Sequence, residues 1–180
     1  MYLNPPMDPT GRQVDLADLM ILCASSYTTT TGSAELVVGC ANHSVYAVDI
    51  SDPRKRPTEM YGKKNGHSEW VTGVAHLADG RVISCGMDSK ICVWSRDKRT
   101  SCDIHAHSGS ISKIATDKTY NLAVSCGYDR AISLWQFPEP RGRAAPVTGP
   151  MLTLRGHENP VLDFFFNNGM YSCTIIALLS

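Results

Sequence analysis

The residue types that could perform chemistry occur in this sequence as two matching sets. Each set has a His, a Ser and an Asp in the same order and at nearly the same spacing. The sets are His67, Ser84 and Asp88, and His107, Ser125 and Asp129. A hydroxyl, an imidazole and a carboxylate together can form the triad of a hydrolase. However, an active site does not need to be repeated, and the sequence has no Gly-x-Ser-x-Gly nucleophile elbow. We therefore predict that the protein is not an enzyme, and we keep a hydrolase as the alternative.

A candidate zinc half-site lies beside the second set. Cys102, His105 and His107 have a spacing that suits zinc, but no second Cys/His pair lies at the distance that a zinc finger needs. The seven cysteines are odd in number and include no Cys-x-x-Cys pair. The sequence thus predicts no metal and no other cofactor. It also predicts reduced thiols, with Cys85 and Cys126 as small core residues.

The charge balance excludes a strong general attraction to nucleic acid or to membranes. The 180 residues include 17 Lys and Arg and 17 Asp and Glu, which gives a formal net charge of zero. One basic run, Arg54–Arg56, lies in a loop between Pro53 and Pro57. We interpret it as a solvated loop, with a nuclear signal or a nucleic-acid patch as the alternative. Because the sequence shows neither a secretory signal nor an apolar run of roughly 20 residues, we expect a cytoplasmic location, with the nucleus as the alternative.

A repeat organises most of the chain. The segments Gly80–Trp94 and Asn121–Trp135 both contain Ser-Cys-Gly-x-Asp and then an apolar alternation that ends in Trp, and they are 41 residues apart. A weaker copy, Leu36–Asp49, precedes them. A fourth copy starts at His157 and reaches Ser172, but the expected Cys-Gly-x-Asp pattern then fails. Such internal periodicity is typical of propellers and other repeat architectures.

Each repeat predicts short antiparallel strands and no helix. On both sides of a tight turn at Asp88, apolar residues alternate with a period of two, and Asp in such a turn can accept hydrogen bonds from nearby amides. The pattern resembles the WD-repeat family, whose unit of roughly 40–45 residues forms one four-stranded blade of a β-propeller. The Asp of the naming Trp-Asp pair is replaced by Ser95 and by Gln136. The resemblance implies an all-β, WD-repeat β-propeller of about three to four four-stranded antiparallel blades, with an incomplete ring.

The predicted organisation is an irregular N-terminal arm followed by one partial propeller. The arm covers residues 1–17, and the propeller covers 18–180. The repeat units lie at roughly 18–57, 58–98, 99–137 and 150–180, the last of them truncated, and a loop insertion occupies 138–149. Because propellers usually need about 4–8 blades, we expect either a truncated product or a ring completed by a second propeller fragment or by self-association.

In the family pattern that this sequence resembles, four residues of each blade form a buried hydrogen-bonded network. The resemblance assigns this structural network to His67, Ser84, Asp88, Trp94, His107, Ser125, Asp129 and Trp135. The carboxylate can accept from the imidazole, whose second nitrogen can pair with the hydroxyl, and the hydroxyl can accept the indole N–H. A fully satisfied network of this kind fixes one arrangement of the chain.

Function on a propeller is expected in its surface loops rather than in the cores of its blades. The resemblance implies that two positions of each repeat reach the same rim: the residue before the turn Asp, and the residue that starts the innermost strand. These positions are Ala41, Met87 and Tyr128, and Trp70, Ser110 and Pro160. We select Trp70, Met87, Tyr128 and Ser110 as candidate protein-binding residues, because Trp, Met and Tyr are enriched at interfaces. The predicted function is a non-catalytic scaffold or adaptor that presents this rim to other proteins in a multiprotein complex, with neither membrane nor nucleic acid expected as a partner.

Overall fold

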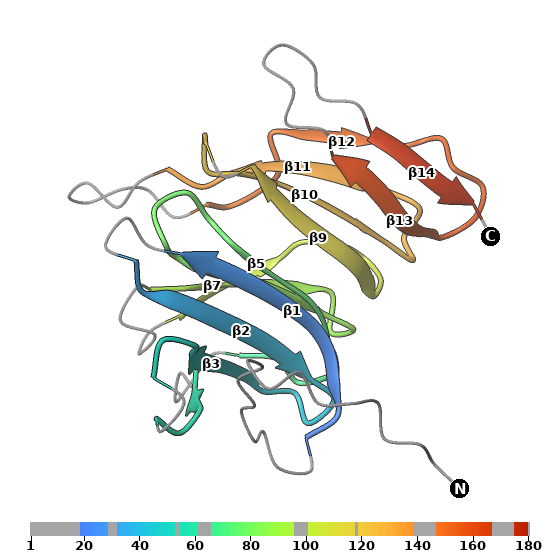
Figure 1. Ribbon diagram of the computed structural model, residues 1–180. Helices are drawn as coiled ribbons and strands as arrows, with labels where there is room; N and C mark the ends of the chain where they lie inside the picture. The colour runs from blue at the N-terminus through green and yellow to red at the C-terminus, as the bar shows by residue number, and fades with distance from the viewer. Residues whose placement is uncertain are drawn as a thin grey trace, which may run out of the picture.

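The computed structural model describes residues 19–28, 32–52, 55–60, 66–95, 101–117, 119–138, 147–166 and 175–179, and all regular structure in these ranges is β (Figure 1). The strands are β1 (Ile21–Thr28), β2 (Ala34–Cys40), β3 (Val45–Asp49), β4 (Thr58–Glu59), β5 (Val71–His76), β6 (Val82–Gly86), β7 (Lys90–Trp94), β8 (Ser101–His105), β9 (Ile111–Asp117), β10 (Leu122–Gly127), β11 (Ile132–Gln136), β12 (Leu152–Leu154), β13 (Val161–Phe166) and β14 (Ile175–Leu179). Within these ranges, no helix is long and apolar enough to cross a membrane.

The strands form three four-stranded antiparallel sheets and one hairpin. We call them blade 1 (β1–β4), blade 2 (β5–β8), blade 3 (β9–β12) and blade 4 (β13–β14). The first strands of successive blades lie side by side, and the blades fan out from them without closing into a ring (Figure 1). The predicted fold class, an all-β propeller with about three to four blades and an incomplete ring, is confirmed.

The blades are offset from the repeat units by one strand. Strand β4 begins the repeat unit predicted at 58–98, yet it pairs with β3 of the preceding unit. Strand β8 pairs in the same way with β7, and β12 pairs with β11 across the insertion at 138–149. Each complete blade therefore takes its outer strand from the start of the next repeat unit, so that backbone hydrogen bonds link successive units.

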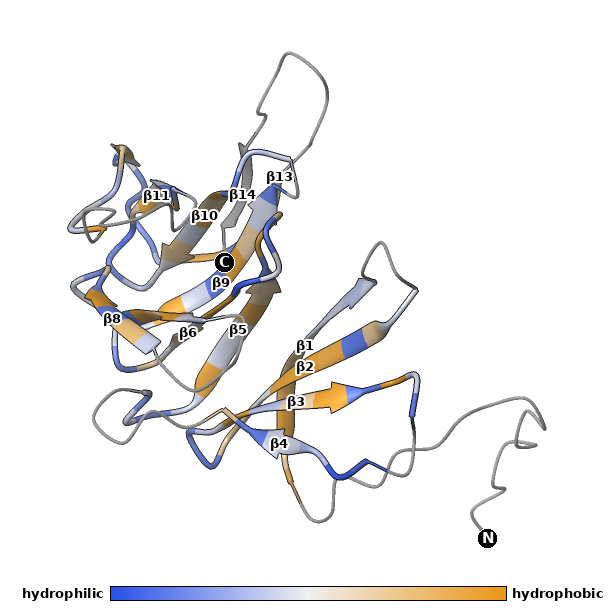
Figure 2. Ribbon diagram, turned by 90° about the vertical axis from the view of Figure 1, so that its left-hand side faces the viewer, coloured by the Kyte–Doolittle hydropathy of each residue, from blue (hydrophilic) through white to orange (hydrophobic). Residues whose placement is uncertain are grey.

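The hydrophobic core lies between the blades. Along β6 the alternation of side chains sends one set of apolar residues towards blade 1 and the other towards blade 3. On the first side, Trp94 belongs to a cluster shared with blade 1. On the second side, Ile83 and Ile91 pack with Ile111 and Trp135 of blade 3. We call the side of a blade that meets the next blade its forward face and the opposite side its back face. Figure 2 shows the apolar residues along the strands of the blades.

The fourth blade differs from the sequence alignment. The alignment puts Ser172 at the position of Ser84, but the strand that pairs with β13 lies further along the chain, at β14. There Ala177 lies opposite Phe164, just as Ser84 lies opposite Val74 in blade 2. The run Ile-Ile-Ala-Leu-Leu of β14 is apolar throughout and contains no Gly or Pro, which favours a strand.

Some sequence predictions concern residues outside the described part of the chain. These are the N-terminal arm at 1–17, residues 139–146 of the loop insertion, Arg54 of the basic run and Cys173. The described cysteines are Cys23, Cys40, Cys85, Cys92, Cys102 and Cys126, and all of them are free thiols.

Candidate functional site

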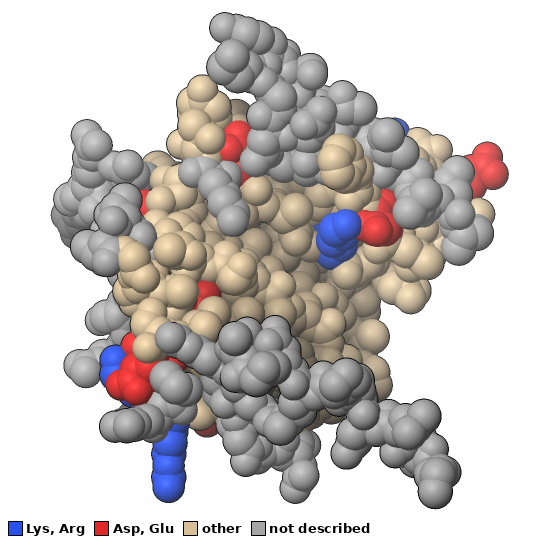
Figure 3. Space-filling view, viewed as in Figure 1, with Lys and Arg blue, Asp and Glu red and all other residues tan. Residues whose placement is uncertain are grey.

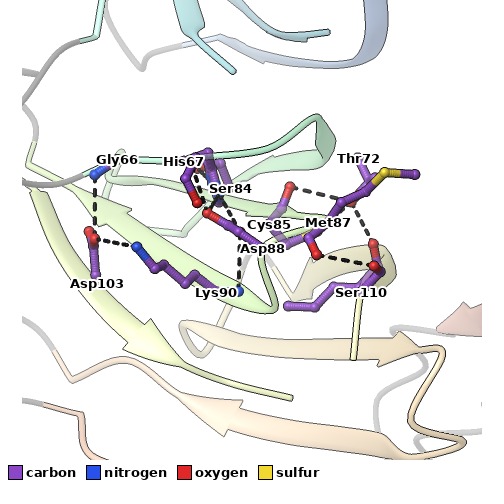
Figure 4. Close-up of polar contacts among 12 residues, drawn as sticks. Gly66, His67, Thr72, Ser84, Cys85, Met87, Asp88, Lys90, Asp103 and Ser110 are labelled. Carbon is purple, nitrogen blue, oxygen red and sulfur yellow. Dashed lines mark hydrogen bonds and ion pairs between the residues drawn. The ribbon is translucent and has the colours of Figure 1, made fainter. Parts of the chain in front are cut away.

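A chain of hydrogen bonds joins four side chains in blade 2 (Figure 4). His67 Nδ1 lies 3.0 Å from Asp88 Oδ1, and His67 Nε2 lies 2.8 Å from Ser84 Oγ. The indole Nε1 of Trp94 donates to the same Ser84 oxygen at 2.8 Å. A neutral imidazole that carries its proton on Nδ1 donates to Asp88 and accepts from Ser84. With that tautomer, each polar side-chain group among these four residues has a hydrogen-bond partner.

The same chain recurs in blade 3. His107 Nδ1 lies 2.8 Å from Asp129 Oδ1, and His107 Nε2 lies 2.7 Å from Ser125 Oγ. The indole Nε1 of Trp135 donates to Ser125 at 2.8 Å. The eight residues that the family pattern assigned to the network thus lie in the expected order. Because each donor and acceptor is buried and satisfied, the arrangement rigidifies both blades.

The carboxylates of both networks are held in the ionised form. Burial alone would raise the pKa of Asp88, but hydrogen bonds from His67 and from the amides of Ser68 and Lys90 bring this pKa below its ordinary value of 3.8. The pKa of Asp129 is lowered in the same way, with hydrogen bonds again outweighing burial. Each network is therefore assembled around a negative charge at neutral pH.

Acid should weaken the protein through these two carboxylates. Because their folded-state pKa values are lowered, the unfolded chain takes up protons first as the pH falls. The stability that they supply is complete above their ordinary pKa, near 3.8, and is lost as the pH falls towards the folded-state values. Urea midpoints measured from neutral to acid pH should show this loss, and Asp88→Asn should flatten it. Midpoints with the same acid dependence in Asp88→Asn and in the native protein would contradict this assignment.

Neither network has the access that a hydrolase needs. The hydroxyl-bearing Ser84 and Ser125 are completely buried, and each already accepts an indole N–H. A nucleophile must instead present its oxygen to a substrate. The geometry favours the structural role of both sets over the hydrolase alternative.

Metal binding and thiol chemistry also lack a suitable site in the described ranges. No group of three or more His, Cys, Asp or Glu side chains there could hold a metal ion. Cys102 lies exposed on the outer strand β8, while His107 belongs to the network of blade 3. Burial raises the pKa of Cys126 to about 12 and also raises the pKa of Cys85. These two thiols therefore stay protonated at neutral pH and fill the core.

The four candidate rim residues form one hydrogen-bonded row. Met87 N donates to Trp70 O at 2.9 Å. Ser110 Oγ donates to Met87 O at 3.0 Å (Figure 4). Tyr128 N then donates to Ser110 O at 2.9 Å. The row crosses from blade 2 to blade 3 and exposes 45% of Trp70, 40% of Met87 and 54% of Tyr128. The structure thus brings the four predicted residues together in one hydrogen-bonded row, which we call the rim row.

Two hydroxyl groups fasten the joint beneath this row. Thr72 Oγ1 of blade 2 donates to Ile111 O of blade 3 at 2.6 Å, while Ser110 of blade 3 donates back to blade 2. The joint between blades 3 and 4 has the equivalent of the first bond, from Ser112 to Val161 O at 3.0 Å. There, however, Pro160 takes the place of Ser110 and has no hydroxyl to donate. The joint between blades 2 and 3, which carries the rim row, therefore has side-chain hydrogen bonds in both directions, whereas the joint between blades 3 and 4 has the bond in one direction.

One rim residue was missed from the sequence. Met20 is exposed, and its carbonyl oxygen accepts the N–H of Ala41 as that of Trp70 accepts the N–H of Met87. It thus extends the rim onto blade 1. The only sequence signal is its position before the first strand, because no His precedes it to mark the start of a repeat.

Two ion pairs outside the networks involve lysines of the surface, Lys113 and Lys55. Uncharged side chains predominate in the visible part of the face formed by β1, β5, β9 and β13, and a basic and an acidic group lie side by side over β9 and β13 (Figure 3). There Lys113 Nζ contacts Asp163 Oδ1 and lies 5.4 Å from the ring centre of Phe164. In the predicted basic run, Lys55 forms an ion pair with Asp49 at 2.7 Å. This pairing weakens the case for Arg54–Arg56 as a patch for nucleic acid.

Comparison with known proteins agrees with the repeated strands and networks. Residues 59–95 and 98–136 match the family model described as WD domain, G-beta repeat. These two segments are WD repeats. Two solved WD-repeat structures, described as Structure of U3-55K and Crystal structure of RRP9 WD40 repeats, each superpose with a TM-score of 0.66, at 20% and 21% identity. Each superposition covers 82% of this chain and 43% or 42% of the solved chain, and it shows the propeller fold.

Several curated proteins are similar to this WD-repeat chain in sequence. The p21-activated protein kinase-interacting protein 1-like of Gallus gallus is 28% identical over 124 residues, which cover 68% of this chain and 31% of that protein. Ribosome biogenesis protein YTM1 of Meyerozyma guilliermondii is 24% identical over 102 residues, which cover 51% of this chain and 22% of that protein. The chain spans about a third or less of the length of these curated relatives.

Proposed function

We propose that this chain is a non-catalytic scaffold that binds partner proteins through the rim row. The observation that carries the proposal is the hydrogen-bonded row from Trp70 to Tyr128, which holds three large exposed side chains across a fastened joint. Exposed Trp, Tyr and Met side chains on a rigid frame are the usual anchors of protein interfaces, because little conformational entropy is lost on binding. Relatives named as a kinase-interacting protein and as DDB1- and CUL4-associated factor 10 support a role in protein assemblies.

Removing an anchor of the rim row should weaken partner binding without unfolding the protein. Trp70→Ala and Tyr128→Ala each delete an exposed aromatic side chain, so the networks of blades 2 and 3 stay intact. At a buried interface such a truncation costs about 2 kcal/mol or more, which corresponds to a loss of affinity of about thirtyfold. We would capture partners from cell extract, identify them by quantitative mass spectrometry, and measure the affinity of each for the variants.

The matched control is Tyr120→Ala. Tyr120 is also an exposed aromatic residue, but it lies in the turn between β9 and β10, at the other end of β10 from Tyr128. Proteins that bind the rim row should be retained by Tyr120→Ala and lost from both rim variants. Equal capture by all three variants would exclude the rim row as the binding surface.

A second candidate is a subunit of a nuclear complex that contains nucleic acid. Several relatives are named ribosome biogenesis protein YTM1, which favours the nucleus over the cytoplasm as the place of work. If this chain contacts RNA through Arg54–Arg56, its affinity for RNA should fall steeply as salt is raised, and replacement of the run by Ala should reduce the slope. Absence of salt-dependent RNA binding would leave the protein scaffold as the sole proposal.

A further inference from the structure

The basic run of blade 1 leads into a threonine on an exposed strand. Lys55 and Arg56 stand three and two positions before Thr58, and all three residues are exposed. Protein kinases select their substrates by charge pattern, and in one class the carboxylates of the peptide groove pair with Lys or Arg at these two positions. The segment 55–58 therefore has the charge pattern of a substrate for such a kinase.

The structure separates Thr58 from the other hydroxyls that follow a basic residue. Five residues of the chain have Lys or Arg three positions before a hydroxyl: Thr58, Ser84, Ser101, Thr116 and Ser133. Ser84 and Ser133 are buried, and so is the side-chain oxygen of Ser101. Thr116 Oγ1 donates at 2.8 Å to a backbone oxygen of blade 2 within the joint between blades. Of the five, only Thr58 is exposed.

Strand β4 lets the chain around Thr58 leave the sheet. It is the outer strand of blade 1 (Figure 2), and it pairs with β3 through only two residue pairs. The acceptor of a kinase must extend into the catalytic cleft, and opening so short an edge strand costs little free energy. Met60, which is 2% exposed and donates its N–H to Val45 O at 2.8 Å, keeps the chain after β4 attached to the blade.

The ion pair of Lys55 does not withhold the run from a kinase. Lys55 Nζ lies 2.7 Å from Asp49 Oδ2, but 60% of the lysine side chain is exposed. Exposed ion pairs contribute little to stability, because water screens both charges. The carboxylates of a kinase can therefore replace Asp49 as the partner of Lys55.

We propose that Thr58 is a phosphorylation site for a protein kinase that selects basic residues before its acceptor. The kinase supplies ATP with magnesium, and Thr58 Oγ1 attacks the γ-phosphorus. The new O–P bond forms as the bond from this phosphorus to the bridging oxygen breaks, the hydroxyl proton passes to a kinase carboxylate, and ADP leaves. Phosphorylation adds a charge of about −1.5 to −2 to a chain whose formal net charge is zero. The proposal does not depend on partner binding at the rim row.

The folded chain, magnesium ATP and the catalytic subunit of cyclic-AMP-dependent protein kinase are sufficient for the test. Mass spectrometry of peptides should find a phosphoryl group on Thr58, which Thr58→Ala should remove and Thr58→Ser should retain. Lys55→Ala and Arg56→Ala should each lower kcat/KM of the kinase for this site by about tenfold or more, because each deletes a charge-assisted hydrogen bond to the kinase. Near-UV circular dichroism of each variant should match that of the native protein.

Ser101 is a matched control within the same chain. Lys98 and Arg99 precede it at the same two positions, and it begins the outer strand of blade 2 as Thr58 begins that of blade 1. Synthetic peptides of residues 52–62 and 95–105 should both be phosphorylated at these hydroxyls, whereas the folded chain should react at Thr58 and not at Ser101. Absence of phosphate from Thr58 in the folded chain would overturn the proposal, and so would reaction of Ser101 at the same rate.

Discussion

Replacing Ser84 with Ala is expected to lower the free energy of unfolding by about 2–5 kcal/mol. The Ser84 hydroxyl is completely buried and serves two partners, the indole N–H of Trp94 and Nε2 of His67. Alanine fills almost the same volume, so the loss comes from two buried polar groups that no longer have a hydrogen-bond partner. Urea unfolding followed by near-UV circular dichroism should show a lower midpoint with an unchanged slope.

Two further variants separate the network from an ordinary buried hydroxyl. Ser125→Ala should cost a similar amount, because Ser125 has the same two kinds of partner in blade 3. Ser133→Ala should cost less than about 1 kcal/mol, because the buried Ser133 hydroxyl has only a long contact of 3.4 Å with Thr153. A loss in Ser84→Ala no larger than that in Ser133→Ala would show that the network does not hold the blades together.

The resemblance to the WD-repeat family predicts the networks because Ser, Asp and Trp recur at one spacing in both repeats. The spacing between the Ser of one strand and the turn Asp fixes both side chains on one hairpin, and the Trp follows on the paired strand. In blade 1 the corresponding positions are apolar: Val38 and Val48 stand where Ser84 and Trp94 stand in blade 2. Both valines are buried, so this blade replaces the polar pair with hydrophobic packing.

The sequence does not reveal the contacts between blades. The bonds from Thr72 to Ile111 and from Ser110 to Met87 join residues that are far apart in sequence, and a single Ser or Thr has no distinctive signature. The pair of Lys113 and Asp163 depends in the same way on the arrangement of β9 beside β13. The order of the rim residues could be predicted from the repeat, whereas the joint that fastens them required the positions of whole sheets.

Replacing Gly127 with Ala is expected to lower the free energy of unfolding by about 1–3 kcal/mol and to displace the rim row. A Cβ atom at this position would overlap the carbonyl oxygen of Ser110 and would lie 3.2 Å from Ile111 Cα. Both are backbone atoms that cannot rotate away. The bond from Tyr128 N to Ser110 O must then lengthen, so the amide of Tyr128 should exchange faster with deuterium than in the native protein.

The control for this variant is Gly149→Ala, because a Cβ atom at Gly149 would meet nothing within 4 Å. Its stability and the exchange of Tyr128 should both stay unchanged.

The counterpart of Gly127 in blade 2 is Gly86, and a Cβ atom there would lie 2.8 Å from His67 Nδ1. At the same register position, blade 1 has Cys40, and no His precedes this blade in the sequence. At Gly86 the imidazole is therefore one of the groups that a Cβ atom would meet, whereas at Gly127 the conflict is with the backbone of Ser110 and Ile111. A Gly127→Ala protein with native stability and native exchange at Tyr128 would contradict this role of Gly127 in holding the rim row.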